Sequence, residues 1–405
     1  MGISQPAPIP LALTVCPDGP PQCRFAQISE AIAAAEPFSL IWVYPGEYDE
    51  TLTLDKSLRL IATEQGEVRL QGVQTGLPTL LLEVSGEMQV VLEGFSVLSP
   101  ADPDPIGTCR EPRSGLCSRG IVVRGEGTLH LTLINVELVQ RGNQGSAGLV
   151  CADLTGEATV LVEQSRVVAH RDGIIWTCPN TNLTIRNTLI SGNRFGGVVV
   201  FTPTLVQRPT TVSVESSFFV GNQGLALGGW GENFELYVVR SEFFGNEAGV
   251  LAQAFDSESK IEIFESIIAQ HQSFGVFFGP ISGFEFDRGR YILAKSQVVG
   301  NLEEAVRVAT SGQVELEENA IEKNGHGVRV VHAGGRLRLR KNEIVQNVGW
   351  GIALDLPECF ENPIPTLGEV QRVFHIEGEN NVLSDNGIGS LCPASFSWPE
   401  DFTTP

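Results

Sequence analysis

Aromatic and acidic side chains recur in the segments that follow a series of glycine-opened apolar runs. The aromatic ones are Trp230, Phe255 and Phe284, and the acidic ones include Asp256, Glu258 and Asp287. Aromatic rings stack on sugar rings, and several converging carboxylates can hold a hard cation such as Ca2+. These residues predict a ligand site with Ca2+ held at Asp256, Glu258 and Asp287. The alternative is that the acidic segments only keep the chain soluble.

A degenerate repeat from about residue 129 to 391 would position these segments. Each unit has a short turn closed by a polar residue, and most units are 23 to 30 residues long. These turn residues are Gln140, His170, Asn193, Asn222, Asn246, His271, Asn301, Asn324, Asn347 and Asn386. Periods in the twenties are typical of a solenoid, in which each coil buries its core face against its neighbours.

A second polar column precedes the first by five residues. It comprises Asn135, Ser165, Thr188, Ser217, Ser241, Ser266, Ser296, Asn319, Asn342 and Asn381. An alternating strand comes before this column, a short apolar strand lies between the two columns, and a glycine-opened strand follows. Each coil is therefore predicted to contain a first, a second and a third strand and three bends. The columns are interpreted as ladders, because Asn tolerates left-handed turns and its amide can bond to the next coil. His170 and His271 are interpreted as ladder members rather than catalysts.

The third strands carry an apolar column at a position predicted to face outward. Its residues are Val122, Val150, Ile175, Val199, Ala226, Leu251, Phe277, Arg307, Arg329 and Ala353. So large an apolar patch is unusual on a monomer. Three interpretations of this apolar column are open: the chain's own loops cover it, a homo-oligomer buries it, or it forms part of a ligand groove. In a groove, Phe277 would contact the ligand, and Arg307 and Arg329 would pair with an acidic sugar.

Composition narrows the function classes. The net charge of −21 makes nucleic acid an unlikely partner, and the apolar runs are too short for membrane insertion. Eight cysteines form four close pairs: Cys16 with Cys23, Cys109 with Cys117, Cys151 with Cys178, and Cys359 with Cys392. Such pairing favours disulfides and a secreted, periplasmic or cell-surface protein. The first residues lack the pattern of an intact signal peptide.

The unit from Asn319 to Val330 resembles those of the pectin lyase-like superfamily. The amphipathic segment 25–35 and the strand-rich segment 40–62 resemble the way many such chains begin. The resemblance implies an all-β, right-handed parallel β-helix of about twelve coils, capped by a helix at 25–35. The domain would span 25–391 with a Pro-rich excursion at 99–118, between an extension at 1–24 and a tail at 392–405.

The motifs of enzymes in that superfamily are absent. The Asp and Arg segments of the pectin methylesterases and the Asp-Asp pair of the polygalacturonases do not occur, and His326 in Gly-His-Gly matches only one polygalacturonase motif. No catalytic residue is identified. The resemblance implies a protein directed to polysaccharides, either binding or cleaving them, in a groove between the third strands and the segments 202–210, 228–234, 254–259 and 279–289. The alternative is a non-catalytic scaffold or adhesin.

Overall fold

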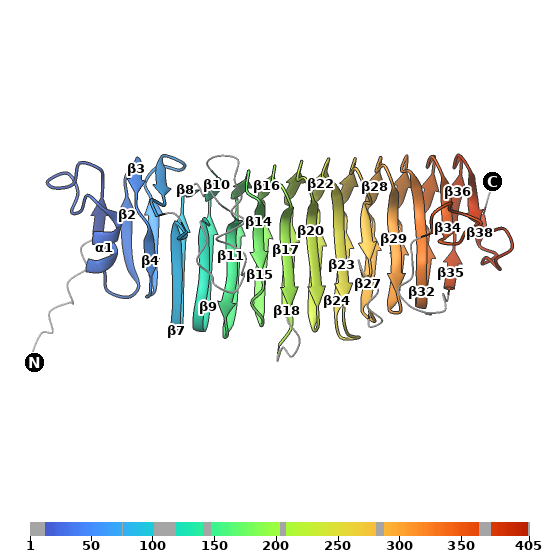
Figure 1. The fold of residues 1–405 in the computed structure, drawn as a ribbon, viewed down its shortest axis with the longest axis horizontal. Helices are drawn as coiled ribbons and strands as arrows, with labels where there is room; N and C mark the ends of the chain where they lie inside the picture. The colour runs from blue at the N-terminus through green and yellow to red at the C-terminus, as the bar shows by residue number, and fades with distance from the viewer. Residues whose placement is uncertain are drawn as a thin grey trace, which may run out of the picture.

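The computed structural model describes residues 13–74, 76–100, 119–140, 147–202, 208–280, 287–363 and 374–403. These residues form a long stack of coils, with the N-terminal and C-terminal parts at opposite ends (Figure 1). Their strands pair in parallel into one sheet of 24 and one of 14 strands. The predicted fold class is confirmed as a parallel β-solenoid, with about 11 regular turns in place of the twelve expected.

The second strands of the coils stack into the 14-stranded sheet. Its members are β3 (Gly46–Asp49), β6 (Val68–Gln71), β8 (Phe95–Ser99), β10 (Glu137–Gln140), β13 (Arg166–Val168), β16 (Leu189–Ser191), β19 (Phe218–Val220), β22 (Glu242–Phe244), β25 (Ile267–Ala269), β28 (Gln297–Val299), β31 (Ala320–Glu322), β33 (Glu343–Val345), β36 (Asn381–Ser384) and β38 (Phe402–Thr403). Most have three residues, of which the middle one is buried.

The first and third strands share the 24-stranded sheet. The strands of the N-terminal part are β1 (Leu13–Val15), β2 (Ser39–Val43), β4 (Leu52–Leu54), β5 (Leu58–Ala62), β7 (Leu80–Glu93) and β9 (Ile121–Ile134). The later third strands are β11 (Ala147–Leu154), β14 (Asp172–Trp176), β17 (Gly196–Thr202), β20 (Leu225–Gly231), β23 (Ala248–Ala254), β26 (Val276–Phe278), β29 (Glu304–Thr310), β32 (His326–Arg340), β34 (Trp350–Leu354) and β37 (Gly389–Cys392). The later first strands are β12 (Glu157–Glu163), β15 (Thr181–Arg186), β18 (Thr210–Glu215), β21 (Phe234–Val239), β24 (Lys260–Phe264), β27 (Arg290–Ala294), β30 (Gln313–Glu317) and β35 (Phe374–Glu379). The expectation of three bends fails at β7, β9 and β32, because each runs from a third strand into the next first strand as one strand.

The polar column between the second and third strands is a buried hydrogen-bonded ladder, as predicted. The side-chain amide of Asn193 donates to Asn222 Oδ1 at 2.8 Å, and that of Asn222 donates to Asn246 Oδ1 at 2.7 Å. The pattern is interrupted by His271, whose ring Nδ1 accepts from the Asn246 backbone N–H at 3.2 Å. His170 is also fully buried in this column. Because the buried amides of this column bond to one another across neighbouring coils, the ladder fixes the register of the stack.

The polar column between the first and second strands also forms a ladder. Two details differ from the prediction: the position of the left-handed residue and the ladder residue of one coil. The residue with left-handed backbone is the one before the ladder residue, for example Arg240 (φ 47°) before Ser241 and Glu265 (φ 49°) before Ser266. Asn135 is itself such a left-handed residue (φ 53°), so Val136 occupies the ladder position of its coil and donates its N–H to Ser165 Oγ. The turn therefore requires its special backbone one residue earlier than predicted.

The glycines that open the third strands are explained by close approach of the next coil. A Cβ atom on Gly173 would lie 2.4 Å from the Gly197 carbonyl oxygen and 3.1 Å from Asn193 Nδ2. On Gly351 it would lie 2.7 Å from the Ser390 carbonyl oxygen and 2.8 Å from Asn386 Nδ2. The glycine therefore leaves room for the ladder amide beside it.

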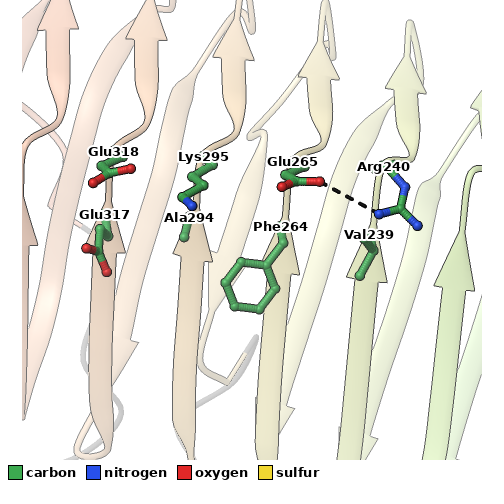
Figure 2. Close-up of a pocket in the computed structure, with 8 residues that line it drawn as sticks. All are labelled: Val239, Arg240, Phe264, Glu265, Ala294, Lys295, Glu317 and Glu318. Atoms are coloured by element: carbon green, nitrogen blue, oxygen red, sulfur yellow. Dashed lines mark ion pairs between the residues drawn. The ribbon is translucent and has the colours of Figure 1, made fainter.

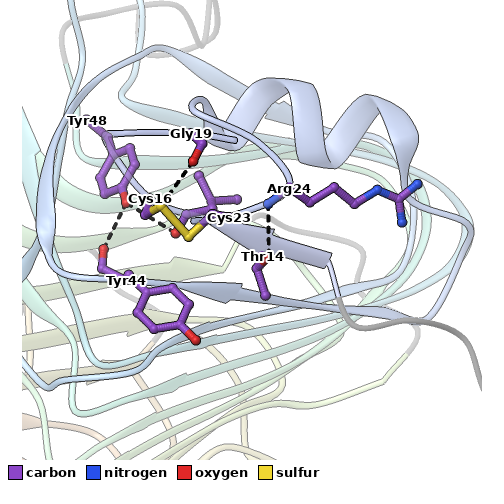
Figure 3. The surroundings of a disulfide bond; sticks show 8 residues. Thr14, Cys16, Gly19, Cys23, Arg24, Tyr44 and Tyr48 are labelled. Atoms are coloured by element: carbon purple, nitrogen blue, oxygen red, sulfur yellow. Dashed lines mark hydrogen bonds between the residues drawn. A yellow bond between two sulfur atoms is a disulfide. The ribbon is translucent and has the colours of Figure 1, made fainter. Parts of the chain in front are cut away.

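The N-terminal end of the stack is capped by α1 (Ile28–Ala34), within the predicted range. Glu50 accepts hydrogen bonds from the Ile28 and Ser29 backbone N–H groups at 2.8 and 2.9 Å, which caps the helix from another part of the chain. Figure 3 shows the disulfide between Cys16 and Cys23 beside this cap. Strand β1 pairs with β2, so described residues before the predicted boundary at 25 already belong to the sheet.

Two further predicted disulfides are present, Cys151 with Cys178 and Cys359 with Cys392. The pair Cys109 and Cys117 and most of the Pro-rich excursion lie outside the described residues. In the tail, β38 adds to the 14-stranded sheet through β36. Described residues include no helix long and apolar enough to cross a membrane.

Candidate functional site

The outward column of the third strands is present, with one residue corrected. The register aligns Val122, Val150, Ile175, Val199, Gly228, Leu251, Phe277, Arg307, Arg329 and Ala353. Gly228 replaces the predicted Ala226, which is fully buried in the core. The predicted residue is two positions out of register, because Ala226 takes the place that Gly197 has in the preceding coil.

The apolar part of this column is buried at two places and open between them. Val122 and Val150 form a buried cluster with Leu81 and Ala147. Leu251 and Phe277 form another with Ala248 and Phe274. Phe277 is only 6% exposed, so its ring packs within this second cluster. Ile175 and Val199, between the two clusters, are half-buried.

The accessible part of the face carries two aromatic rings on neighbouring strands. Phe201 and Trp230 are in register on β17 and β20, with ring centroids 6.3 Å apart and planes inclined by 50°. Phe201 is 36% exposed and Trp230 is half-buried against the Leu251 cluster. A Cβ atom on Gly228 would lie 2.9 Å from Trp230 Cζ3, so the indole lies across this glycine. The result is a partly exposed aromatic platform, defined here as Phe201 and Trp230.

The charge of Arg307 is balanced within the chain. Its guanidinium pairs with Glu304, whose side chain is 2% exposed, and with Glu303 at 3.3 Å. The guanidinium carbon also lies 5.4 Å from the ring centroid of Phe274 and 5.2 Å from that of Phe277. Arg307 therefore compensates a buried carboxylate and packs beside aromatic rings.

Arg329 repeats this arrangement one coil further along. Its Nε donates to Oδ1 of the fully buried Asp355 at 3.0 Å, and its guanidinium carbon lies 4.1 Å from the Phe360 ring centroid. His326 is nearby, with its ring 5.1 Å from Phe360 and its Nδ1 accepting from the Trp350 N–H at 3.0 Å. Burial lowers the pKa of His326, and Arg329 lowers it further, against the opposing effect of Glu304. The His326 ring is therefore held neutral near pH 7.

The predicted Ca2+ ligands are not gathered. Asp256 accepts from the backbone N–H groups of Asn233, Glu258 and Ser259, so its carboxylate organises its own turn. Glu258 is exposed. Asp287 is buried, accepts a hydrogen bond from the Tyr291 hydroxyl, and has its pKa raised to about 7 by burial. Across the described ranges, no group of three or more His, Cys, Asp or Glu side chains could hold a metal ion.

The remaining predicted site residues and groove segments lie near the platform or outside the described residues. Phe255 is half-buried after β23, and its backbone N–H donates to the Gly231 carbonyl at 2.9 Å. Phe284 lies outside the described residues, as do parts of the predicted groove segments 202–210 and 279–289. Of segment 228–234, residues up to Gly231 belong to β20 rather than to a loop.

Sequence reasoning missed Phe201 and Glu304. Phe201 lies two residues after Val199 on the same strand, so extending the outward column by one alternation would have found it. Glu304 lies three residues before Arg307, but no pattern in the sequence indicated that its side chain is buried.

A groove of about 450 Å3 lies away from the platform, on the first strands. Figure 2 shows its lining, with Val239, Phe264 and Ala294 beside the charged residues of the left-handed bend. The Arg240 and Glu265 side chains in this lining are 3.8 Å apart. This groove does not coincide with the predicted ligand groove.

Comparison with known proteins reveals structural likeness only. No family model matches the chain, and no curated protein matches it. A double mutant of the periplasmic alginate epimerase AlgG is similar at 14% identity and a TM-score of 0.54, over 87% of this chain and 77% of that one. The A-module of Azotobacter vinelandii mannuronan C-5 epimerase AlgE6 matches at 14% identity and a TM-score of 0.52, over 93% of this chain and 94% of that one. The Dettilon tailspike protein matches at 11% identity and a TM-score of 0.51, over 90% of this chain and 64% of that one.

These identities are too low to carry an activity from one chain to another, but the shared architecture extends over most of the chain. Together with the parallel pairing of the strands, the likeness establishes that this chain has a parallel β-helix fold like that of these proteins.

Proposed function

We propose that the chain binds a polysaccharide along the outer face of the third strands, with the aromatic platform as its main contact. The observation that carries the proposal is the pair of partly exposed rings of Phe201 and Trp230, held in register on adjacent parallel strands. Parallel strands lie about 4.8 Å apart, so rings on successive coils suit consecutive parts of an extended chain. Two similar β-helices are epimerases of alginate and mannuronan, which supports a carbohydrate ligand.

The ion pairs of Arg307 and Arg329, the residues predicted to bind an acidic sugar at the end of this face, change the expected ligand. Each guanidinium is already paired with a buried carboxylate. An acidic sugar would have to share these arginines with Glu304 and Asp355, whereas a neutral sugar needs only ring stacking and hydrogen bonds. The proposal therefore favours a neutral polysaccharide. The three disulfides are compatible with a protein that meets this ligand outside the cytoplasm.

The test is a glycan array followed by a binding titration of the strongest ligand with the parent chain and Trp230→Ala. Loss of one stacking ring should weaken binding by about 1 kcal/mol, roughly 5-fold, measured well below the thermal midpoint, which should also fall because Trp230 packs on the Leu251 cluster. Phe38→Ala is the matched control, because that ring is 68% exposed at the N-terminal end and should not affect binding. If no polysaccharide binds, or if both variants bind like the parent, the proposal fails.

An assay for new reducing ends and for unsaturated products, with and without Ca2+, determines whether binding leads to cleavage. Binding without product would make the protein a carbohydrate-binding module. Cleavage that depends on Ca2+ would require a cation site other than the predicted one, because Asp256, Glu258 and Asp287 are not gathered in this structure.

The second candidate function is a non-catalytic scaffold. It is favoured by the burial of the outward apolar column at Val122, Val150, Leu251 and Phe277, because those side chains stabilise the stack instead of contacting a ligand. A chain that binds no glycan but withstands heat and protease would support this function.

A further inference from the structure

A second apolar surface lies on the outer side of the 14-stranded sheet. Between β16 and β28 its outward residues are Leu189, Ser191, Phe218, Val220, Glu242, Phe244, Ile267, Ala269, Gln297 and Val299. Four large apolar ones are substantially exposed, Phe218 by 44%, Val220 by 36%, Phe244 by 44% and Ile267 by 37%, whereas Leu189 and Val299 are half-buried and Ala269 is buried. We call this surface the second-strand face. Figure 1 shows its strands stacked along the long axis, among them β16, β22 and β28.

The second-strand face differs from the neighbouring face of the same coils. There, the outward residues of the first strands include Glu215, Glu235, Lys260, Glu262 and Arg290. On the second-strand face, Glu242 is the one charged residue among the ten outward positions named above. In a chain with a net charge of −21, a flat and nearly uncharged apolar surface indicates a protein contact.

We propose that the second-strand face binds a second copy of this chain, with the two β-helices antiparallel. The two-fold axis lies in the contact plane, along the strand direction and between β22 and β25. This rotation reverses the order of the coils. A residue at a given position of one strand therefore faces the residue at the same position of the opposing strand. The rotation sets β22 against β25, β19 against β28, β16 against β31 and β13 against β33 of the second copy.

This pairing brings apolar residues together at the last position of the four central strands. Phe244 meets Ala269 of the second copy, and Val220 meets Val299. On the next strands Ser191 meets Glu322, and beyond them the half-buried Val168 meets the buried Val345. The apolar contact is thus self-complementary over its four central coils, as a two-fold contact requires.

The charges of the face and its edge also match. Arg166 meets Glu343 of the second copy, and Arg240 on the neighbouring bend meets Glu265. Figure 2 shows the alternation of charge along this bend, where Lys295 and Glu318 follow Arg240 and Glu265. No like charges face one another among these pairs. Glu242, opposite Ile267, is the single charged residue set against an apolar one.

The area predicts a weak dimer. Eight strands at a spacing of about 4.8 Å and three residues in width give a footprint of roughly 34 Å by 10 Å. That footprint is less than half of the ~800 Å2 per partner of a standard stable interface. We therefore expect a dimer that forms in the micromolar range and dissociates on dilution.

Sedimentation velocity of the full chain over the micromolar range tests the proposal. The parent should shift toward twice the monomer mass as its concentration rises. Phe244→Glu should remain monomeric, because it places a charge in the apolar centre of the contact. Phe38→Glu adds the same charge at an exposed position of the N-terminal end and should dimerise like the parent. A parent that stays monomeric, or a dimer that survives Phe244→Glu, overturns the proposal.

Cysteine cross-linking tests the antiparallel register. Val220→Cys and Val299→Cys lie three coils apart in one chain, so they cannot bond to each other within it. Mixed under mild oxidation, the two variants should form a disulfide-linked heterodimer, whereas neither should link to itself. A self-linked Val220→Cys dimer, or no heterodimer from a chain that dimerises, would refute this arrangement.

Discussion

Acidification should weaken the polar ladder between the second and third strands at His271. The His271 side chain is fully buried, and its Nδ1 accepts a hydrogen bond from the Asn246 backbone N–H at 3.2 Å. Burial lowers the pKa of this ring from 6.5 to about 4. A protonated ring cannot accept that hydrogen bond, and its charge would lie in the core.

The sign and size of the effect follow from proton linkage. Between pH 6.5 and 4 the unfolded chain binds more protons at this ring than the folded chain does, so stability falls as the pH falls through this range. At 1.36 kcal/mol per pKa unit, a shift of about 2.5 units corresponds to about 3 kcal/mol in total, of which about 2 kcal/mol is lost by pH 5. The full contribution is present above the unfolded pKa. His170, whose pKa burial also lowers to about 4, acts in the same direction.

The assay compares the parent with His271→Asn by denaturant unfolding near pH 7.5 and near pH 5. Asparagine can accept from Asn246 and donate to Asn301, as the other amides of the ladder do, but it does not titrate. The variant should therefore lose about 2 kcal/mol less than the parent between the two pH values. The protection factor of the Asn246 amide against hydrogen exchange should also fall more in the parent than in the variant at the lower pH. Equal losses in both proteins would refute the reasoning.

Three further substitutions test other buried groups. Asp287→Asn should stabilise the chain near pH 8 but not near pH 4, as measured by urea unfolding at both pH values. The reason is that burial raises the pKa of Asp287 to about 7, so its ionisation removes stability as the pH rises from about 4 to 7. Asn324→Ala should cost about 2 kcal/mol or more, because it removes the oxygen that accepts from the buried Asn301 backbone and side-chain N–H groups, whereas the exposed Lys323→Ala should cost little in the same measurement. Arg329→Ala should cost about 3 kcal/mol in thermal unfolding, because it removes the ion pair of the buried Asp355; an unchanged midpoint would contradict this role.

The coil architecture could be predicted from sequence because each coil repeats the same physical constraints. The amide ladder needs a polar residue at a fixed place, and the close approach of the next coil needs a glycine or alanine beside it. Both constraints recur often enough to be aligned. The alignment failed where a coil departs from the usual residue, as at Ala226 in the glycine position and at Val136 in a ladder position.

The environment of the site residues could not be predicted in the same way. Phe277 and Leu251 occupy outward positions of a strand, yet Phe274 and Ala248 pack beside them and bury them. Asp256 and Asp287 lie in adjacent segments, but one binds backbone N–H groups and the other binds Tyr291. Periodicity fixes the direction of a side chain, whereas burial depends on bends and loops that do not repeat.

The two arginines link the stability of the stack to the choice of ligand. Removing the Glu304 and Asp355 carboxylates from water is costly, and Arg307 and Arg329 offset that cost in place. A ligand carboxylate at this position would add a negative charge beside guanidinium groups that already have acidic partners, so its attraction to either guanidinium would be opposed by the buried acid. The aromatic platform has no such competition, because its rings have no charge to share. Discrimination against acidic sugars should therefore arise from the same ion pairs that hold the third strands together, and weakening those pairs should reduce stability before it changes the ligand.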